Sequence, residues 1–261
     1  MREWAERHRA AILLSMLAIA IAALWSRGPI PQPLAYHGFS DTRSWLGIPN
    51  FGDVMSNLPY AAAGGFGLWL TLGPRGREIF SHPAHRRPYA VFFLGVVLTG
   101  LGSAYYHLAP DNARLVWDRL PIAVIVMALS AAFVADRIHQ RAGNGWALAL
   151  LTAAGIGSVL QWHWSEIAGQ GDLRFYLLVQ FFPMAALPAI CILYRRTRYT
   201  SGGHLAWLMA WYVLARICEI MDAEIFRLSG SAVGGHALKQ LAVLGSVMAI
   251  IRMLIASRRA G

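Results

Sequence analysis

Residues 99–121 read TGLGSAYYHLAPDNARLVWDRLP and join two strongly apolar runs of the sequence. The segment carries a serine, a histidine and an aspartate where these runs end. Ser103 and His107 are four residues apart, so on a helix their side chains share one face. Asp118 follows His107 by eleven residues, across a short polar connection. The pattern predicts two consecutive helices whose neighbouring ends hold these three side chains.

The composition is typical of a helical membrane protein. The chain has 261 residues, of which 57% are hydrophobic and 14% charged, whereas a soluble domain has about 25% charged residues. The charges gather in short connections between long apolar runs, and no linker divides the sequence. We therefore expect an all-α, polytopic transmembrane helix bundle that forms a single integral membrane domain over residues 1–261.

The apolar runs predict eight spans, at residues 10–26, 53–72, 88–107, 118–136, 146–162, 173–193, 204–222 and 235–256. The first run could instead be a cleaved signal peptide. The residues that follow it read SRGPIPQP and contain no A-x-A-like cleavage site. We therefore expect residues 1–26 to form a retained N-terminal anchor.

Arginine is distributed unequally between the two sets of connections. The formal net charge is +10, and Lys239 is the single lysine among 23 basic residues. Nucleic-acid binding is not favoured, because the arginines lie beside predicted spans, where membrane orientation accounts for them. One set of connections holds Arg2, Arg7, Arg9, Arg75, Arg77, Arg86, Arg87, Arg137, Arg141, Arg195, Arg196, Arg198, Arg258 and Arg259, and the other holds Arg27, Arg43, Arg114, Arg174 and Arg227. This asymmetry predicts a multi-pass protein of the plasma (inner) membrane with both termini in the cytoplasm.

In this orientation several polar residues fall at one depth on the extracytoplasmic side. They are Ser103, His107, Asp118, His236 and Gln240. Ionisable groups within spans cost several kcal/mol unless they are paired, so they are candidates for function. A lone histidine here would more often be a hydrogen-bonded structural residue. Two histidines with a nearby carboxylate and hydroxyl instead suggest a catalytic zinc site, in which zinc lowers the pKa of a bound water.

At the level of motifs, the sequence resembles the alkaline ceramidase family, within the CREST superfamily of membrane hydrolases. The resemblance lies in DVMSNLPYAAAG at 53–64, GLGSAYYHLAP at 100–110, WDRLP at 117–121, ARICEIMDAEIF at 215–226 and GHALKQ at 235–240. The family spacing is S-x3-H, then eleven residues to Asp, then a distant H-x3-H. The resemblance implies a bacterial-type member with a seven-helix ceramidase-like core at residues 40–256, plus the additional N-terminal span.

Carried over by position, the resemblance implies that His107 and His236 bind zinc. It also implies that Asp118 activates water and that the Ser103 hydroxyl assists. Gln240 stands where the family has a third histidine, and an amide oxygen is a poorer zinc ligand than imidazole. The implied reaction is hydrolysis of the amide bond of ceramide-like lipids, with the lipid substrate entering from the bilayer.

Alternatives remain for several of these residues. His163 could substitute for the missing histidine, although a structural role is favoured. Asn57, Glu219 and Asp222 could orient the ligands, but an ion pair of Glu219 with Arg216 explains the acidic residues equally well.

Two aspartates also have structural interpretations. Asp53 could cap its helix, and Asp118 could cap its own helix or pair with Arg114 or Arg119.

The function itself has alternatives. The protein could be a non-catalytic receptor or lipid-binding protein on the same scaffold, a reading that Gln240 favours. An enzyme of the same kind could also cleave an ester in place of an amide.

Overall fold

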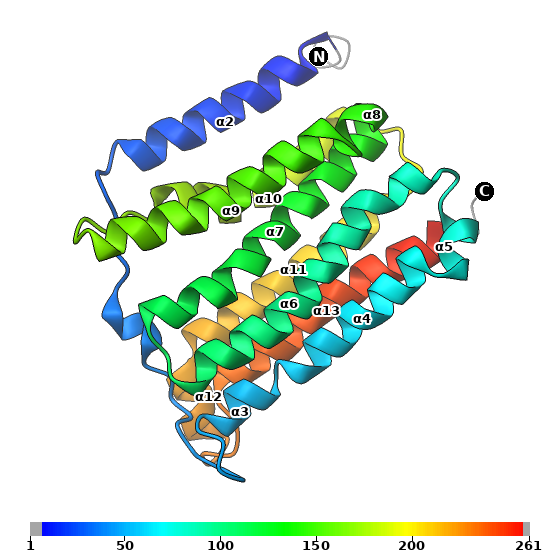
Figure 1. The fold of residues 1–261 in the computed structure, drawn as a ribbon. Coiled ribbons are helices and arrows are strands. Elements are labelled where there is room, and N and C mark those ends of the chain that lie inside the picture. The colour runs from blue at the N-terminus through cyan, green and yellow to red at the C-terminus, as the bar shows by residue number, and fades with distance from the viewer. Residues whose placement is uncertain (1–6, 258–261) are drawn as a thin grey trace.

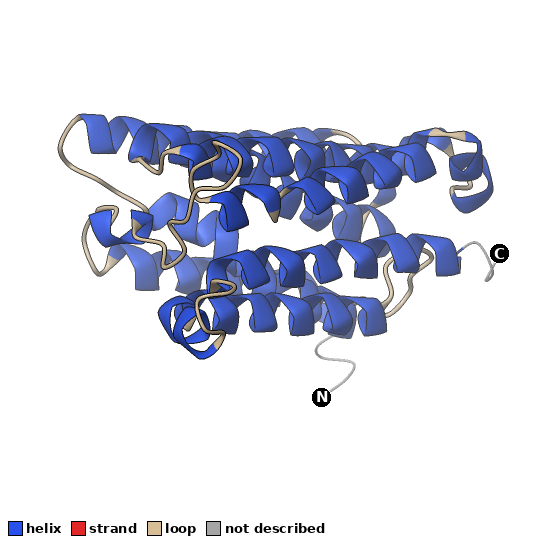
Figure 2. Cartoon of the chain, turned by 90° about the horizontal axis from the view of Figure 1, so that it is seen from below, coloured by secondary structure: helices blue, strands red, loops and turns tan. Residues whose placement is uncertain are grey.

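The computed structural model describes residues 7–257, and this part of the chain is all-α, as predicted. It contains no strand, only an isolated bridge between Trp45 and Ile48. Figures 1 and 2 show the long helices running side by side, with the connections gathered at the two ends of the bundle. We call the end that contains α3 and α12 the site end, and the end that contains α5 and α8 the arginine-rich end.

Each predicted span overlaps a long helix. The long helices are α2 (Arg9–Trp25), α4 (Leu58–Leu72), α6 (Arg87–Leu108), α7 (Asn112–Arg137), α9 (Trp146–Ile167), α10 (Arg174–Leu193), α11 (Gly202–Ile220) and α13 (Gly235–Ser257). Short helices lie in the connections, namely η1 (Leu34–His37), α3 (Phe51–Met55), α5 (Pro74–Ile79), η2 (Pro83–Arg86), α8 (Gln140–Gly143) and α12 (Asp222–Leu228).

The helices are those of a multi-pass membrane protein, but the count of eight spans is not confirmed. By length and composition, four segments of the described chain could cross a membrane: Pro83–Leu108, Asn112–Arg137, Arg174–Leu193 and Gly235–Ser257. The pair α11 and α12, bent by 76°, gives a fifth if it is one span. Helix α9 is long enough, but polar residues in its last turns lower its mean hydropathy. Helices α2 and α4 have 17 and 15 residues, fewer than the roughly 20 that cross a bilayer.

Two predicted boundaries are wrong. Residues 53–72 do not form one helix, because the chain breaks between α3 and α4 at Ser56 and Asn57. Helix α7 begins at Asn112, six residues before Asp118, and Asp111 caps it by accepting a hydrogen bond from the Arg114 backbone N–H at 2.6 Å. Asp118 therefore lies inside the helix, and its interpretation as a helix cap is excluded.

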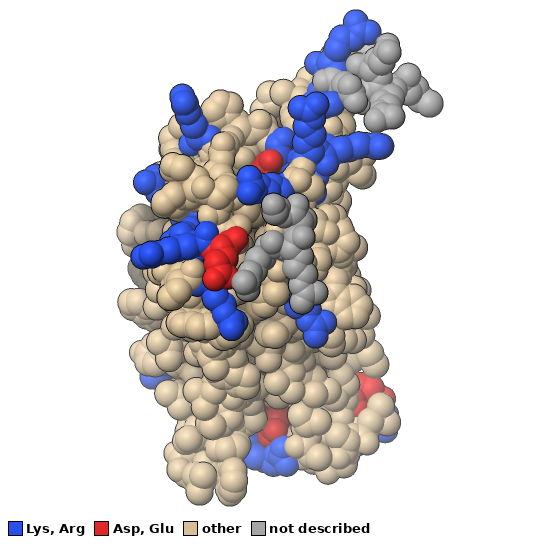
Figure 3. All heavy atoms as spheres, turned by 90° about the vertical axis from the view of Figure 1, so that its right-hand side faces the viewer, with Lys and Arg blue, Asp and Glu red and all other residues tan. Residues whose placement is uncertain are grey.

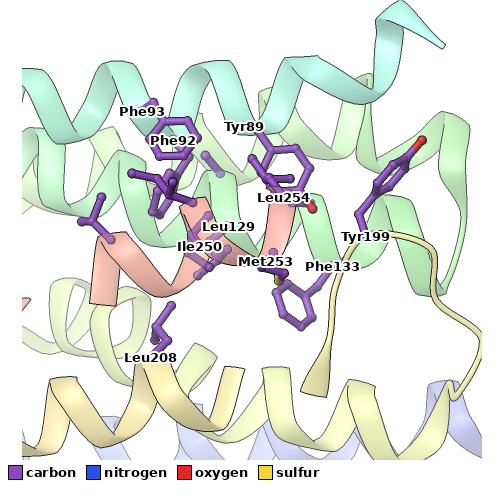
Figure 4. Close-up of a cluster of buried hydrophobic side chains, with 14 of the residues drawn as sticks. Tyr89, Phe92, Phe93, Leu129, Phe133, Tyr199, Leu208, Ile250, Met253 and Leu254 are labelled. Atoms are coloured by element: carbon purple, nitrogen blue, oxygen red, sulfur yellow. The ribbon is translucent and has the colours of Figure 1, made fainter. Parts of the chain in front are cut away.

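Helix α6 packs against both α4 and α7, and α11 packs against α13. Small residues allow the close approach of α6 to its neighbours: a Cβ at Gly100 would lie 2.7 Å from the Ala61 nitrogen, and one at Gly102 would overlap the Trp117 carbonyl oxygen. Such small residues are common where membrane helices pack. The main apolar core lies nearer the arginine-rich end, around Phe93, and Figure 4 shows its aromatic and aliphatic side chains between the helices.

Helix α2 lies at the edge of the bundle (Figure 1) and packs against α10. None of its residues is buried. The Arg9 guanidinium lies 5.2 Å from the Tyr194 ring, and that of Arg174 lies 5.2 Å from the Trp25 ring. Helix α2 therefore contributes no buried side chain to the bundle.

The charge asymmetry of the sequence is visible on the surface. Figure 3 shows many basic side chains over the upper part of the face that it draws, with few acidic ones. Arg2, Arg258 and Arg259, which belong to the same set, lie outside the described residues.

Candidate functional site

Three helices bring the predicted residues together at the site end. Ser103 and His107 lie in the last turns of α6, Asp118 in the second turn of α7, and His236 and Gln240 in the first turns of α13. All five side chains are buried, with exposed fractions of 1% for Ser103 and His107, 4% for His236, 8% for Gln240 and 9% for Asp118. Residues 129 positions apart therefore meet inside an apolar bundle.

The two imidazoles face each other directly. The Nε2 atoms of His107 and His236 are 3.1 Å apart. The Phe39 ring packs against both, with its centroid 4.7 Å from that of His107 and 4.3 Å from that of His236. The opposite nitrogen of His107, Nδ1, is buried without a hydrogen-bond partner in the described chain. The two rings therefore face each other through their Nε2 atoms.

Gln240, Ser103 and Asp118 form a chain of polar contacts beside the histidines. The Gln240 amide Nε2 donates to the Ser103 Oγ at 3.4 Å. The Asp118 carboxylate lies close to the Ser103 hydroxyl. Because Ser103 accepts from Gln240, its own hydrogen is available to donate to Asp118. The arrangement links the position of the predicted third ligand to the predicted base.

No protein-family model and no curated protein matches the chain. The likeness to alkaline ceramidases accordingly remains a resemblance of motifs.

The spacing of the two imidazoles is suitable for one metal ion. Two nitrogens that bind the same tetrahedral zinc at 2.0–2.1 Å are about 3.3 Å apart, close to the 3.1 Å between these Nε2 atoms. A third strong ligand is not present: the described residues contain no group of three or more His, Cys, Asp or Glu side chains that could hold a metal. The strong donors at this point are therefore the two imidazoles, and the Gln240 amide lies one turn from His236 on α13. His163 lies on α9, which packs mainly against α7 and α10.

Asp222 supports the histidine pair through the backbone. Its Oδ1 accepts from the His236 N–H at 2.8 Å, and its Oδ2 accepts from the Ser40 N–H at 2.9 Å. Glu219 behaves differently, since it accepts from Lys239 at 3.3 Å and pairs with Arg216. Asp222 thus fixes the start of α13, while Glu219 holds the expected ion pair.

Asn57 and Asp53 lie fully buried at the break between α3 and α4. The Asn57 Nδ2 donates to the Asp53 carbonyl oxygen at 2.7 Å, whereas the Asn57 Oδ1 and both Asp53 carboxylate oxygens have no partner in the described chain. Asp53 therefore does not cap α3, contrary to that interpretation. Burial, and then repulsion from Asp222, raises the pKa of Asp53 to about 7.

The ion-pair alternatives for Asp118 are not present. Arg114 pairs with Asp111 at 3.2 Å. The Arg119 guanidinium instead donates to the Gln32 Oε1 at 2.6 Å and lies over aromatic rings, 4.3 Å from that of Trp162 and 4.7 Å from that of Tyr176. Asp118 therefore forms no ion pair with Arg114 or Arg119, and its neighbour in the candidate site is Ser103.

Sequence reasoning missed the contributions of Phe39 and Lys239 and assigned Arg119 the wrong contact. Phe39 covers the histidines from a loop without periodicity, and nothing in its neighbourhood indicated this. Arg119 is buried among aromatic residues, including Trp162, which is fully buried. Lys239 could have been found, because a single lysine inside an apolar run needs a partner.

Proposed function

We propose that the protein is a metal-dependent membrane hydrolase that cleaves the amide bond of a ceramide-like lipid. The observation that carries the proposal is the convergence of His107 and His236 with Ser103 and Asp118 inside an apolar bundle. Nothing in the local sequence requires α13 to meet the ends of α6 and α7. A buried set of two imidazoles, a carboxylate and a hydroxyl is suited to hydrolysis.

In this proposal zinc is held by His107 and His236, and it supplies Lewis acidity that polarises a carbonyl and acidifies water. Asp118 accepts a proton from the attacking water and later returns it to the leaving amine. The Ser103 hydroxyl donates a hydrogen bond to the carbonyl oxygen as negative charge develops on it. The Phe39 ring, which packs against both histidines, and the surrounding helices keep bulk water from the reacting groups.

A second candidate is a non-catalytic receptor or lipid-binding protein on the same scaffold. Gln240 favours it, because an amide stands where a strong zinc ligand is expected. The two candidates separate by one assay: a purified protein loaded with zinc releases fatty acid from a long-chain ceramide, or from an ester analogue, only if it is an enzyme. Binding without release would support the receptor.

Replacing Gln240 with histidine tests the ligand set. Gln240 lies one turn from His236 on the same face of α13, so an imidazole there completes a three-histidine site. We expect Gln240→His to raise zinc affinity by at least about tenfold, since even outer partners of metal ligands change affinity by about 10–100-fold. Metal content of the purified protein, measured by mass spectrometry, reports the change.

Gln140→His is the matched control, because Gln140 is exposed at the arginine-rich end. It adds an imidazole without adding a ligand to the site. Equal zinc content in Gln240→His, Gln140→His and the wild type would exclude Gln240 from the ligand set.

The proposed orientation places both termini in the cytoplasm of a bacterial-type inner membrane and the site on the outer side. It rests on the arginine asymmetry. Reporter fusions at residues 80 and 140 are expected to be active as cytoplasmic fusions, and those at residues 112 and 230 as external ones. A cytoplasmic signal at residue 112 would contradict the orientation.

A further inference from the structure

The backbone of His107 is held by a side chain from a distant part of the chain. His107 lies in the last turn of α6, which ends at Leu108. The last four carbonyl groups of a helix have no intrahelical partner and need one from elsewhere. The Asn50 Nδ2 supplies it, because it donates to the His107 carbonyl oxygen at 2.8 Å. A residue 57 positions away in the sequence therefore fixes the backbone that carries one of the two imidazoles.

Asn50 has a backbone conformation that few residues adopt. Its φ is 47° and its ψ is 43°, in the left-handed region where Gly, Asn and Asp are the residues best tolerated. The Asn50 carbonyl oxygen accepts from the Val54 N–H at 3.0 Å, and the Phe51 N–H donates to the Arg43 carbonyl oxygen at 3.0 Å. Asn50 is thus tied to α3 on one side and to the preceding loop on the other. Its amide holds α6 from a fixed position.

Helix α3, which Asn50 precedes, contacts both helices that carry the histidines. It packs against α6 and against α13, and Figure 1 shows it at the site end of the bundle. On α13, the Asp222 carboxylate accepts from the His236 N–H at 2.8 Å. The backbone of each histidine is therefore held by one side chain from outside its own helix, Asn50 for His107 and Asp222 for His236.

The His107 ring lacks the hydrogen bond that usually orients a metal ligand. A ligating histidine normally donates its second ring N–H to a carboxylate, a carbonyl or a water. No group of the described chain bonds to the buried His107 Nδ1. The ring is oriented instead by Phe39, whose centroid lies 4.7 Å away, and by the position of its own backbone. The bond from Asn50 to that backbone therefore matters more here than in a site where Nδ1 has a partner.

We infer that Asn50 is a positioning residue for His107. By holding the end of α6, it keeps the His107 Nε2 at 3.1 Å from that of His236, a spacing suited to one metal ion. Without this bond the last turn of α6 can fray, as helix ends do, and the two nitrogens separate. The effect on metal binding rests on the proposed metal site, whereas the placement of the ring can be measured without metal.

Two substitutions of Asn50 test the inference while keeping the backbone conformation. Asn50→Gly removes the donor, and glycine adopts a positive φ readily. Asn50→Asp keeps the shape and tolerates the same conformation, but it has no N–H and turns a carboxylate oxygen toward the His107 carbonyl. Ser231→Gly is the matched control, because Ser231 has a φ of 63° and is exposed in the connection before α13.

The first measurement is the reaction of histidines with diethyl pyrocarbonate in the metal-free, full-length protein in a neutral detergent. Peptide mass spectrometry then gives the rate at each site. His107 is 1% exposed, so it should react slowly in the wild type. We expect it to react about tenfold faster in both Asn50 variants, as the loss of one hydrogen bond allows. The rate at His85, which is buried at the arginine-rich end, should stay the same, as should all rates in Ser231→Gly.

The second measurement is zinc affinity by competition with a chelator, well below the unfolding temperature of each variant. Both Asn50 variants should bind zinc about 10–100-fold more weakly than the wild type, the usual effect of losing a group that orients a ligand. A wild type that binds no zinc would refute the proposed function, and the reactivity of His107 would still decide the role of Asn50. Unchanged reactivity of His107, or an equal increase at His85, would overturn the inference. Faster reaction at His107 with undiminished zinc affinity would also overturn it.

Discussion

Asp118→Asn is expected to lower the rate of ceramide hydrolysis by about 10²–10⁴-fold, the contribution of a general base. The amide keeps the shape of the carboxylate and can still contact Ser103, but it cannot accept a proton from water. Asp118 neither caps α7 nor pairs with Arg114 or Arg119, so its loss should not unfold the helix. Zinc content and thermal unfolding of the variant should stay close to those of the wild type.

Asp111→Asn is the matched control for this experiment. It makes the same chemical change at the exposed cap of α7, where Asn caps a helix as well as Asp does, and activity should be retained. Ser103→Ala and His107→Ala test the partners of Asp118, and both should lose activity. Full activity in Asp118→Asn, with loss of activity in His107→Ala, would remove Asp118 from the mechanism while leaving the metal site.

Gly102→Ala is expected to give the largest change in stability. A Cβ at this position overlaps the backbone carbonyl of Trp117 on α7, and backbone cannot move aside as a flexible side chain can. Overpacking of this kind costs about 1–3 kcal/mol in free energy of unfolding. The same insertion should move Ser103 away from Asp118, which are the next residues on the two helices, so activity should fall as well.

Gly157→Ala on α9 serves as the control for Gly102→Ala. An added Cβ at Gly157 has no neighbour within 4 Å, and alanine is the better helix former by about 1 kcal/mol. Gly157→Ala should therefore be neutral or stabilising, measured by denaturation in detergent. An unchanged midpoint for Gly102→Ala would show that α6 and α7 can separate without cost, and that their close approach does not define the site.

The all-α class could be predicted from the long apolar runs of the sequence. The residues of the candidate site could be predicted because they are polar residues at the ends of those runs. Ser103, His107 and His236 are polar positions at the ends of apolar runs, and such positions need partners inside a membrane. The helix boundaries were harder. The break at Ser56 and Asn57 is marked by two polar residues and by Pro59, but the predicted span includes them as part of one helix. The cap at Asp111 took the role that Asp118 could have had.

The contacts made by the loop before α3 could not be predicted at all. Phe39 reaches the histidines from a segment with neither helical nor strand periodicity, and its position depends on distant partners. Arg119 was expected to act through charge, but it acts mainly through stacking on aromatic rings. These interactions are tertiary, and one sequence does not contain the pairing of segments that produces them.

The same loop has a mechanical consequence. It bonds in turn to the connection before α10 through Ile30 and to α9 through Gln32. It then bonds to α6 and α7 through His37, to α12 through Ser40, and to the connection before α13 through Arg43. The loop therefore crosses the site end and is hydrogen-bonded to each of these helix ends and connections. When the surrounding lipid thins or stretches laterally, the helices at this end cannot spread without breaking hydrogen bonds to this loop. We therefore expect the distance between α6 and α13 to change little when membrane tension changes.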